Sequence, residues 1–200
     1  PSLVGSEMCI RDRHFISPCD CRLSVYPIEP QMEVMIKNTC YTVGSLLRDE
    51  RLAEHFKDGY LWVFRLSVDD YHRYIYVDNG RESVRRRIPG VLHTVNPVAN
   101  DVCPIYKENT REYSLLKSEH FGTLLMMEVG ALMVGKIENC PVMSHVRRGQ
   151  EKGNFAFGGS TIIYMTQKDK VFPDMDILIN SADGIETKVQ IGSRIGKGKN

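Results

Sequence analysis

The pattern of apolar and polar residues predicts a chain made mostly of short β-strands. Alternation of the two kinds predicts strands over Phe15–Ile28 and Glu33–Val43, with a turn region at Pro27 and Pro30 between them. Asp78-Asn79-Gly80 is typical of a hairpin turn. Further strand-like segments are Tyr60–Ser67, Tyr71–Val77, Ser83–Ile88, Thr123–Ile137 with a break at Val129-Gly130, Ser144–Gly149, Asn154–Phe157 and Thr161–Thr166.

One segment has the spacing of a helix. Ser45–Lys57 carries apolar residues at positions 46, 47, 52, 53 and 56, Ser45 is able to cap its first turn, and Asp58-Gly59 is suited to end it. A loop is expected over Asn96–Asn109. With one or two short helices among many strands, the sequence predicts an α+β protein that is predominantly β, with a barrel-like or sandwich core.

The composition is that of an ordinary globular domain. The 200 residues are 42% apolar and 26% charged, enough for one domain with a core, and the net charge of +1 favours neither nucleic acid nor an acidic partner. The longest stretch without a charged residue, Gly153–Gln167, is too short and too polar to span a bilayer, which takes roughly 20 apolar residues. Binding to a membrane surface stays open.

The cysteines and the first residues set two further expectations. None of the six cysteines forms a C-x-x-C pair, and Cys19 and Cys21 alone would give a metal only two ligands, so we expect free thiols, no metal and a cytosolic setting. Residues 1–13 show no helical or strand period and resemble a translated adapter tail. We therefore expect a non-native tail over 1–13 and a single domain over 14–200, in a chain that lacks its own N-terminus.

Candidate chemistry lies in Gly158-Gly159-Ser160-Thr161, between two strand-like runs. Glycine permits a tight backbone in which a serine hydroxyl attacks the carbonyl before it, an N→O acyl shift. Loss of the resulting ester by β-elimination leaves a dehydroalanine, which hydrolyses to a pyruvoyl group. The competing interpretation is a structural β-bulge, and on these four residues alone the bulge is favoured.

Several segments in order change that balance. They are FISPCD (15–20), RLSVDDYHRY (65–74), IPGVLHTVNP (88–97), EVGALMVGKI (128–137), GQEKGNFAFGGSTI (149–162) and GIETKVQIGSRIG (184–196). Together they strongly resemble the phosphatidylserine decarboxylase family, from His14 to about Gly196. The resemblance implies a self-processing enzyme that converts phosphatidylserine to phosphatidylethanolamine and carbon dioxide, through a Schiff base on its own pyruvoyl group.

The resemblance also assigns roles to individual residues. Ser160 matches the serine that cleaves the chain after Gly159 and becomes the pyruvoyl cofactor, giving fragments 1–159 and 160–200. Asp20 matches the acid of a serine-protease-like relay, and His72 lies in the segment that carries its histidine. Many bacterial members carry a second histidine where this chain has Ile75, so His72 would do both tasks, or processing would be slow.

Each assignment has a simpler alternative. Asp20 is suited to cap a turn after Pro18, His72 to be an ordinary strand histidine, and His93 either to line the substrate pocket or to bond its own loop. Asp70 is a candidate to orient His72. For the whole chain, the alternatives are a non-catalytic lipoyl-like β-barrel module and a family member that folds but does not process itself.

The expected partners follow from the resemblance. A phospholipid substrate requires the protein to sit peripherally on the cytoplasmic face of a membrane, with its two processed chains still associated. A basic cluster, Arg81, Arg85, Arg86 and Arg87, lies beside the apolar residues 88–92 and is a candidate membrane contact, against the alternative of a solvated strand. A homo-oligomer stays open.

Overall fold

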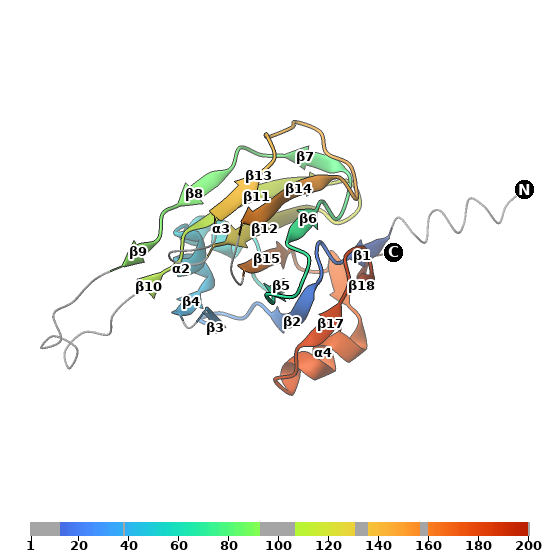
Figure 1. Cartoon of the computed structure of the whole chain (residues 1–200). Coiled ribbons are helices and arrows are strands. Elements are labelled where there is room, and N and C mark those ends of the chain that lie inside the picture. Colours follow the sequence, from blue (N-terminus) through green and yellow to red (C-terminus); the bar gives the residue numbers. More distant parts are fainter. Residues whose placement is uncertain (1–12, 38, 93–106, 131–135, 157–159, 200) are drawn as a thin grey trace, which may run out of the picture.

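A large antiparallel sheet organises the molecule (Figure 1). The computed structural model describes residues 13–37, 39–92, 107–130, 136–156 and 160–199. The sheet has eight strands, of which seven follow in the order β17 (Thr187–Val189), β2 (Cys21–Pro27), β5 (Tyr60–Leu66), β15 (Ser160–Thr166), β12 (Thr123–Val129), β11 (Arg111–Ser118) and β7 (Gly80–Glu82). The eighth strand, β8 (Arg86–Ile88), pairs with β11.

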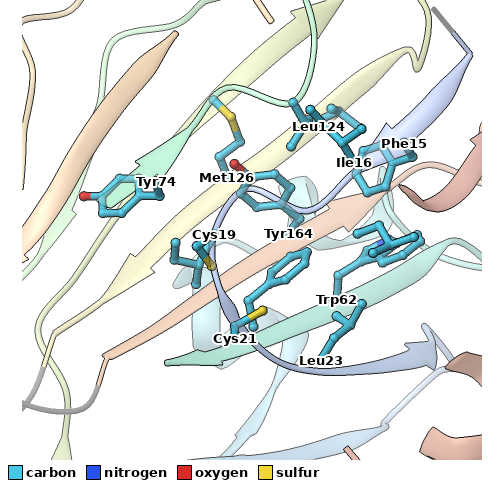
Figure 2. Close-up of a cluster of buried hydrophobic side chains, with 14 of the residues drawn as sticks. Phe15, Ile16, Cys19, Cys21, Leu23, Trp62, Tyr74, Leu124, Met126 and Tyr164 are labelled. Carbon is cyan, nitrogen blue, oxygen red and sulfur yellow. The ribbon is translucent and has the colours of Figure 1, made fainter. Parts of the chain in front are cut away.

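Both faces of this sheet are covered, because neighbouring residues of a strand point to opposite faces. Along β5, Trp62 and Phe64 belong to one buried apolar cluster, whereas Leu61 belongs to a second. The first cluster contains the ring pair of Phe15 and Trp62, with centroids 4.8 Å apart (Figure 2). The α+β, predominantly β class predicted from the sequence is confirmed.

Smaller sheets and one helix lie on the face of the first cluster. They are the sheet β13 (Lys136–Asn139), β14 (Glu151–Ala156) and β6 (Arg73–Ile75), the sheet β1 (His14–Ile16), β18 (Arg194–Gly198) and β16 (Val171–Pro173), and the helix α4 (Met175–Ala182). Helix α4 lies along β2, where the Val25 amide donates to Ser181 Oγ over 2.9 Å. The sequence patterns did not predict α4.

The second cluster is covered by the hairpin β3 (Glu33–Ile36) and β4 (Thr39–Thr42) and by two short helices. The sequence predicted a single helix over Ser45–Lys57, and the structure has α2 (Val43–Leu47) and α3 (Glu50–Glu54) instead. Arg48 adopts a left-handed conformation that ends α2, and Asp49 caps α3 through the Leu52 amide. Ser45 is the third helical residue, in a capping box with Thr42.

Other boundaries also differ from prediction. Phe15–Ile28 is two strands in different sheets, β1 and β2, because the chain turns at Ser17, whose hydroxyl donates to the Cys19 carbonyl. Glu33–Val43 is the hairpin β3–β4 rather than one strand. Within Ser144–Gly149 the sheet contact is a single bridge between Val146 and Gly80.

The turn at Asp78-Asn79-Gly80 does not form the predicted hairpin. Its flanking strands separate: β6 pairs with β14, and β7 pairs with β11. The buried Asp78 carboxylate accepts hydrogen bonds from Ser118 and from the His120 amide, which hold this turn against β11. Strand β11 was not predicted, and most of the loop over Asn96–Asn109 lies outside the described residues, between β9 (Val91–Leu92) and β10 (Lys107–Glu108).

Candidate functional site

Ser160 is the first residue of the central strand β15. It is 1% exposed and lies opposite Leu66 of β5. Its side chain lies on the same face as Ile162 and Tyr164, which belong to the first apolar cluster. Gly158 and Gly159 lie outside the described residues, so the predicted choice between a reactive turn and a bulge is not tested.

Asp20 lies at the same end of the sheet. Antiparallel pairing of β2 with β5 places Arg22 opposite Arg65, and Asp20 therefore lies just beyond the row that contains Leu66 and Ser160. Its Oδ1 accepts a hydrogen bond from the Ile191 amide over 2.7 Å, and the side chain is half-buried. This bond joins Asp20 to a distant segment rather than to the turn after Pro18, and it leaves the second carboxylate oxygen for other contacts.

Two connections of the chain run between the large sheet and the smaller sheet that contains β6 and β14. One joins β5 to β6 and contains His72, and the other joins β14 to β15 and ends at Ser160. The Phe155 amide donates to the His72 carbonyl over 3.0 Å, which holds His72 against the end of β14. Among the described residues, Nδ1 of His72 is buried and has no hydrogen-bond partner.

The surroundings of His72 define what it can contact. Asp70 accepts from the Ser67 amide over 2.6 Å and so closes the turn before His72. Ile75 is half-buried in β6, and its amide donates to the Pro18 carbonyl, next to the Asp20 segment. Strand register thus places Asp20 and Ser160 at one end of the large sheet, and backbone hydrogen bonds place His72 beside Phe155 and Ile75 beside Pro18.

Two thiols flank the candidate acid. Cys19 and Cys21 are buried and free, and the exposed Cys40 and half-buried Cys140 are free as well. Burial raises the pKa of Cys19, as do its hydrogen bond to Cys21 and the negative charges of Asp20 and Asp70. The Cys19 thiol therefore stays protonated, and both buried side chains pack as small apolar groups beside Asp20.

Two further candidate contacts from the sequence are His93 and the basic cluster. His93 lies outside the described residues. The basic cluster is not a common surface, because the Arg85 side chain is 10% exposed and pairs with Glu82. Arg86 pairs with Asp49, and Arg81 donates to His145. Among the described residues, no helix has both the length and the apolar character needed to cross a bilayer.

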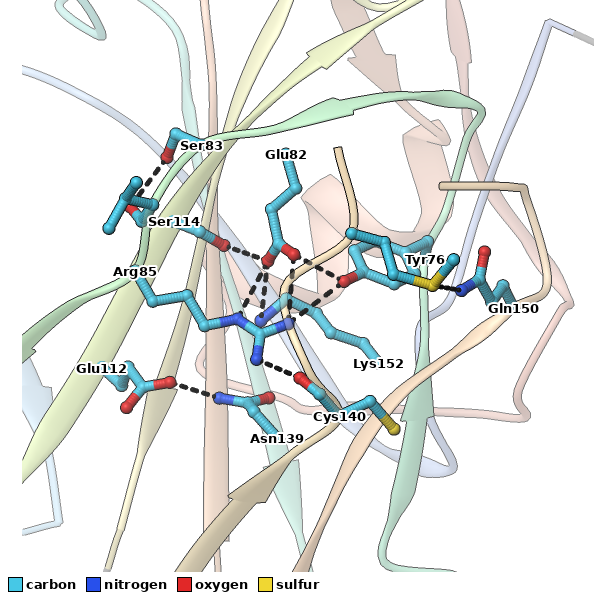
Figure 3. Close-up of polar contacts among 12 residues, drawn as sticks. Tyr76, Glu82, Ser83, Arg85, Glu112, Ser114, Asn139, Cys140, Gln150 and Lys152 are labelled. Carbon is cyan, nitrogen blue, oxygen red and sulfur yellow. Dashed lines mark hydrogen bonds and ion pairs between the residues drawn. The ribbon is translucent and has the colours of Figure 1, made fainter. Parts of the chain in front are cut away.

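A buried polar network, missed by the sequence analysis, fills part of the space between the sheets (Figure 3). The Glu82 carboxylate accepts from Arg85, from Tyr76 over 2.8 Å and from Ser114 over 2.7 Å. Lys152 Nζ lies 2.7 Å from Glu128 Oε1 and 3.7 Å from Glu82 Oε1. The only signal in the sequence is a lone charge, Glu128, in an otherwise apolar strand.

The two carboxylates of this network differ in their ionisation. For Glu82, burial opposes ionisation, but the hydrogen bond from Arg85 and the charge of Lys152 outweigh it, so its pKa is lowered. For the fully buried Glu128, burial outweighs the attraction of Lys152, so its pKa is raised. The network therefore holds one carboxylate whose charged form is favoured and one whose charged form is opposed by burial, with Lys152 as the largest influence in its favour.

The family model of phosphatidylserine decarboxylase matches residues 7–197. The chain belongs to this family. It is 48% identical over 184 residues to phosphatidylserine decarboxylase proenzyme 2 of Clostridium acetobutylicum, covering 92% of this chain and 63% of that protein. The corresponding proenzyme of Clostridium tetani is 42% identical over 185 residues, covering 91% of this chain and 62% of that protein.

The proenzyme of Ruminiclostridium cellulolyticum is 39% identical over 188 residues, with 92% of this chain and 63% of that protein covered. The chain thus spans less than two thirds of the length of these phosphatidylserine decarboxylase relatives. The family match begins at residue 7, inside the stretch 1–13 that we predicted to be non-native. That prediction, and the boundaries of the domain, stay predictions.

Proposed function

We propose that residues 14–200 form the catalytic domain of a phosphatidylserine decarboxylase that cleaves itself between Gly159 and Ser160. The observation that supports the proposal is the strand register, which puts Ser160 and Asp20 at one end of the large sheet. Beside it stands the Nδ1 of His72, which is buried without a hydrogen bond in the described residues. An unpaired buried nitrogen costs free energy unless it serves a partner or a reaction.

The proposed cleavage uses groups of the chain itself. His72 takes the hydroxyl proton of Ser160, and the oxygen attacks the Gly159 carbonyl carbon. The amide bond breaks as the nitrogen of residue 160 gains a proton, which leaves an ester. A base then removes the α-proton of residue 160, and the Gly159 carboxylate departs to leave a dehydroalanine. Water hydrolyses the imine form of this residue, which releases its nitrogen as ammonia and leaves a pyruvoyl group.

The position of Ser160 fits such a group. Ser160 is the first residue of β15, and its side chain is withdrawn from water. A pyruvoyl group there supplies an electron sink for loss of carbon dioxide from an amine-bearing substrate. In this proposal His72 holds or returns a proton at the reacting carbon, and Asp20 orients the imidazole.

The two fragments are expected to stay associated. Fragment 160–200 would contain β15, which pairs with β5 and β12 of the other fragment. It would also contain β17 and β18, which pair with β2 and β1. All seven residues of β15 are buried, so separation would expose the centre of the molecule.

The proposed substrate is phosphatidylserine, and the proposed location is peripheral, on the cytoplasmic face of a membrane. The support is the family, whose relatives carry the name of this activity. The lipoyl-like alternative loses its basis with the family assignment. The unprocessed family member keeps one supporting observation, because Ile75 offers no imidazole beside the Pro18–Asp20 segment.

The test is the intact mass of the purified, denatured chain. Cleavage predicts fragments 1–159 and 160–200, the second with a blocked pyruvoyl end. Ser160→Ala should give one uncut chain, whereas Thr161→Val, which removes the adjacent hydroxyl, should still be cut. His72→Ala should slow cleavage by about 100- to 10,000-fold, the usual contribution of a general base. An uncut wild-type chain would contradict the proposal and favour the unprocessed alternative.

A further inference from the structure

The proposed cleavage site lies in a connection between two different sheets. Strand β14, before it, pairs with β13 and β6. Strand β15, after it, pairs with β12 and β5. We call β14 and β15 the two arms of this connection. Because the arms pair with no strand in common, these strand pairings do not by themselves fix one arm relative to the other. The relative position of the arms depends on contacts between the sheets.

One ion pair makes that contact close to the connection. Lys152 is in β14, and its Nζ lies 2.7 Å from Glu128 Oε1 in β12. Glu128 lies opposite Ile162, two residues after Ser160, in the pairing of β12 with β15. The pair therefore joins the arm before the proposed cleavage site to the strand that holds the arm after it.

Neighbouring groups hold the same carboxylate. The second oxygen of Glu128 accepts from Asn139 Nδ2 over 3.2 Å, and Asn139 lies opposite Gly153 in the pairing of β13 with β14. The amide oxygen of Asn139 accepts from the Tyr74 hydroxyl over 3.0 Å. Glu128 is thus bound from the smaller sheet by two side chains, which restricts both its direction and its distance from β14.

Burial makes this contact rigid rather than loose. The side chains of Lys152 and Glu128 are 0% and 1% exposed. In such surroundings the attraction between opposite charges is screened far less than at the surface. Removal of one partner leaves a buried charge without compensation, whereas replacement of both by apolar side chains of similar volume is often tolerated.

We propose that the Lys152–Glu128 pair is a positioning device that aligns the arms of the cleavage connection, so that the Ser160 hydroxyl meets the carbonyl before it. The inference rests on the proposed self-cleavage. Lys152 and Glu128 are positioning residues, and they act through the relative placement of β14 and β15. A shift of about 1 Å in such an alignment is enough to slow a reaction about 100-fold.

The experiment compares cleavage rates in three variants. Lys152→Met should slow the appearance of fragments by about 100-fold, from the misplacement expected above. Lys152→Met with Glu128→Leu should restore most of the rate, because the contact is again filled and no charge is left alone. Glu151→Gln is the matched control, since Glu151 pairs with Arg73 within the smaller sheet and should leave the rate unchanged.

A second readout separates alignment from general stability. Hydroxylamine cleaves esters readily, and among the amides of this chain it attacks chiefly Asn79-Gly80, which gives fragments of different mass. The fraction of chain that it cuts after Gly159 therefore reports how much ester forms. Lys152→Met should lower this fraction in protein that is still folded by circular dichroism. A folded Lys152→Met chain that cleaves at the wild-type rate would overturn the inference, as would equal slowing by Glu151→Gln. If the single variant does not fold, failure of the folded double variant to cleave would count against alignment by a filled contact.

A third readout does not depend on cleavage. In the Ser160→Ala chain, Lys152→Met should speed hydrogen exchange at residues 160–162 and Glu151→Gln should not. Unchanged exchange would overturn the inference even if the wild type cleaves itself. An uncut wild type with the expected change in hydrogen exchange would instead refute the proposed function. The Lys152–Glu128 pair would then only hold β15 in position.

Discussion

The space between the large sheet and the strands that cover it is filled in two different ways. Around Trp62 and Phe64 it contains rings and aliphatic side chains, whose attraction has little directionality (Figure 2). Around Glu82 and Lys152 it contains charges that are bonded in fixed directions (Figure 3). The apolar region supplies most of the driving force for folding, whereas the charged region restricts how the sheets are aligned.

The largest expected effect comes from breaking the charged region. Lys152→Met should lower the free energy of unfolding by about 3–5 kcal/mol, because Glu128 is left buried without its cation. The double variant with Glu128→Leu should lose far less. Urea unfolding of the Ser160→Ala chain measures both. Equal losses of unfolding free energy in the single and double variants would contradict an uncompensated charge as the cause.

The apolar region should respond to lost volume instead. Leu124 is fully buried in the first cluster, and Leu124→Ala should lower the free energy of unfolding by about 2–5 kcal/mol through the cavity that it leaves. Leu124→Met, which conserves volume, should cost less than about 1.5 kcal/mol. The same urea titration checks the pair, and similar costs for both variants would contradict a packing origin.

Two buried tyrosines of the first apolar cluster test where the charged region ends. The Tyr76 hydroxyl donates to Glu82, so Tyr76→Phe should cost about 1–3 kcal/mol. The Tyr164 hydroxyl is buried without a partner in the described part of the chain, so Tyr164→Phe should be neutral or stabilising. Thermal unfolding of both variants decides the matter. A large cost for Tyr164→Phe would assign its hydroxyl to the charged region.

The smallest effect concerns pH. The pKa of Glu82 is lowered in the folded protein, so its contribution to stability is present above the unfolded value of about 4.3 and is lost as pH falls through the folded value. Glu82→Gln should flatten this acid limb of the stability curve. The pKa of Glu128 is raised, so its own contribution has the opposite slope and declines as pH rises through the folded value. Urea midpoints between pH 3 and pH 7 measure both slopes.

The apolar region was largely predictable, because alternation marks strands directly. The segments that became β5 and β15 were identified from their residues alone. Ser160 became a candidate only through the family resemblance, because its four-residue motif alone favours a bulge. The break between α2 and α3 was not predicted, because it depends on the left-handed conformation of the single residue Arg48. The sequence pattern contains no measure of that conformation.

The charged region could not be predicted from the sequence. Glu128 and Lys152 lie 24 positions apart, and their pairing depends on which strands face one another. Strand β11 was missed for a related reason: its first residue, Arg111, is charged yet fully buried, where its guanidinium bonds the carbonyl of Leu46. A buried charge has its explanation in distant partners, and local patterns do not record them.

The pairing of Lys152 with Glu128 also bears on how such a molecule changes over generations. A lineage that replaces either residue alone passes through a protein with an uncompensated buried charge, and selection for folding removes most such carriers. The two positions are therefore expected to change together among descendants, either both ionic or both apolar. The pair then behaves as one heritable unit, although its halves are encoded far apart.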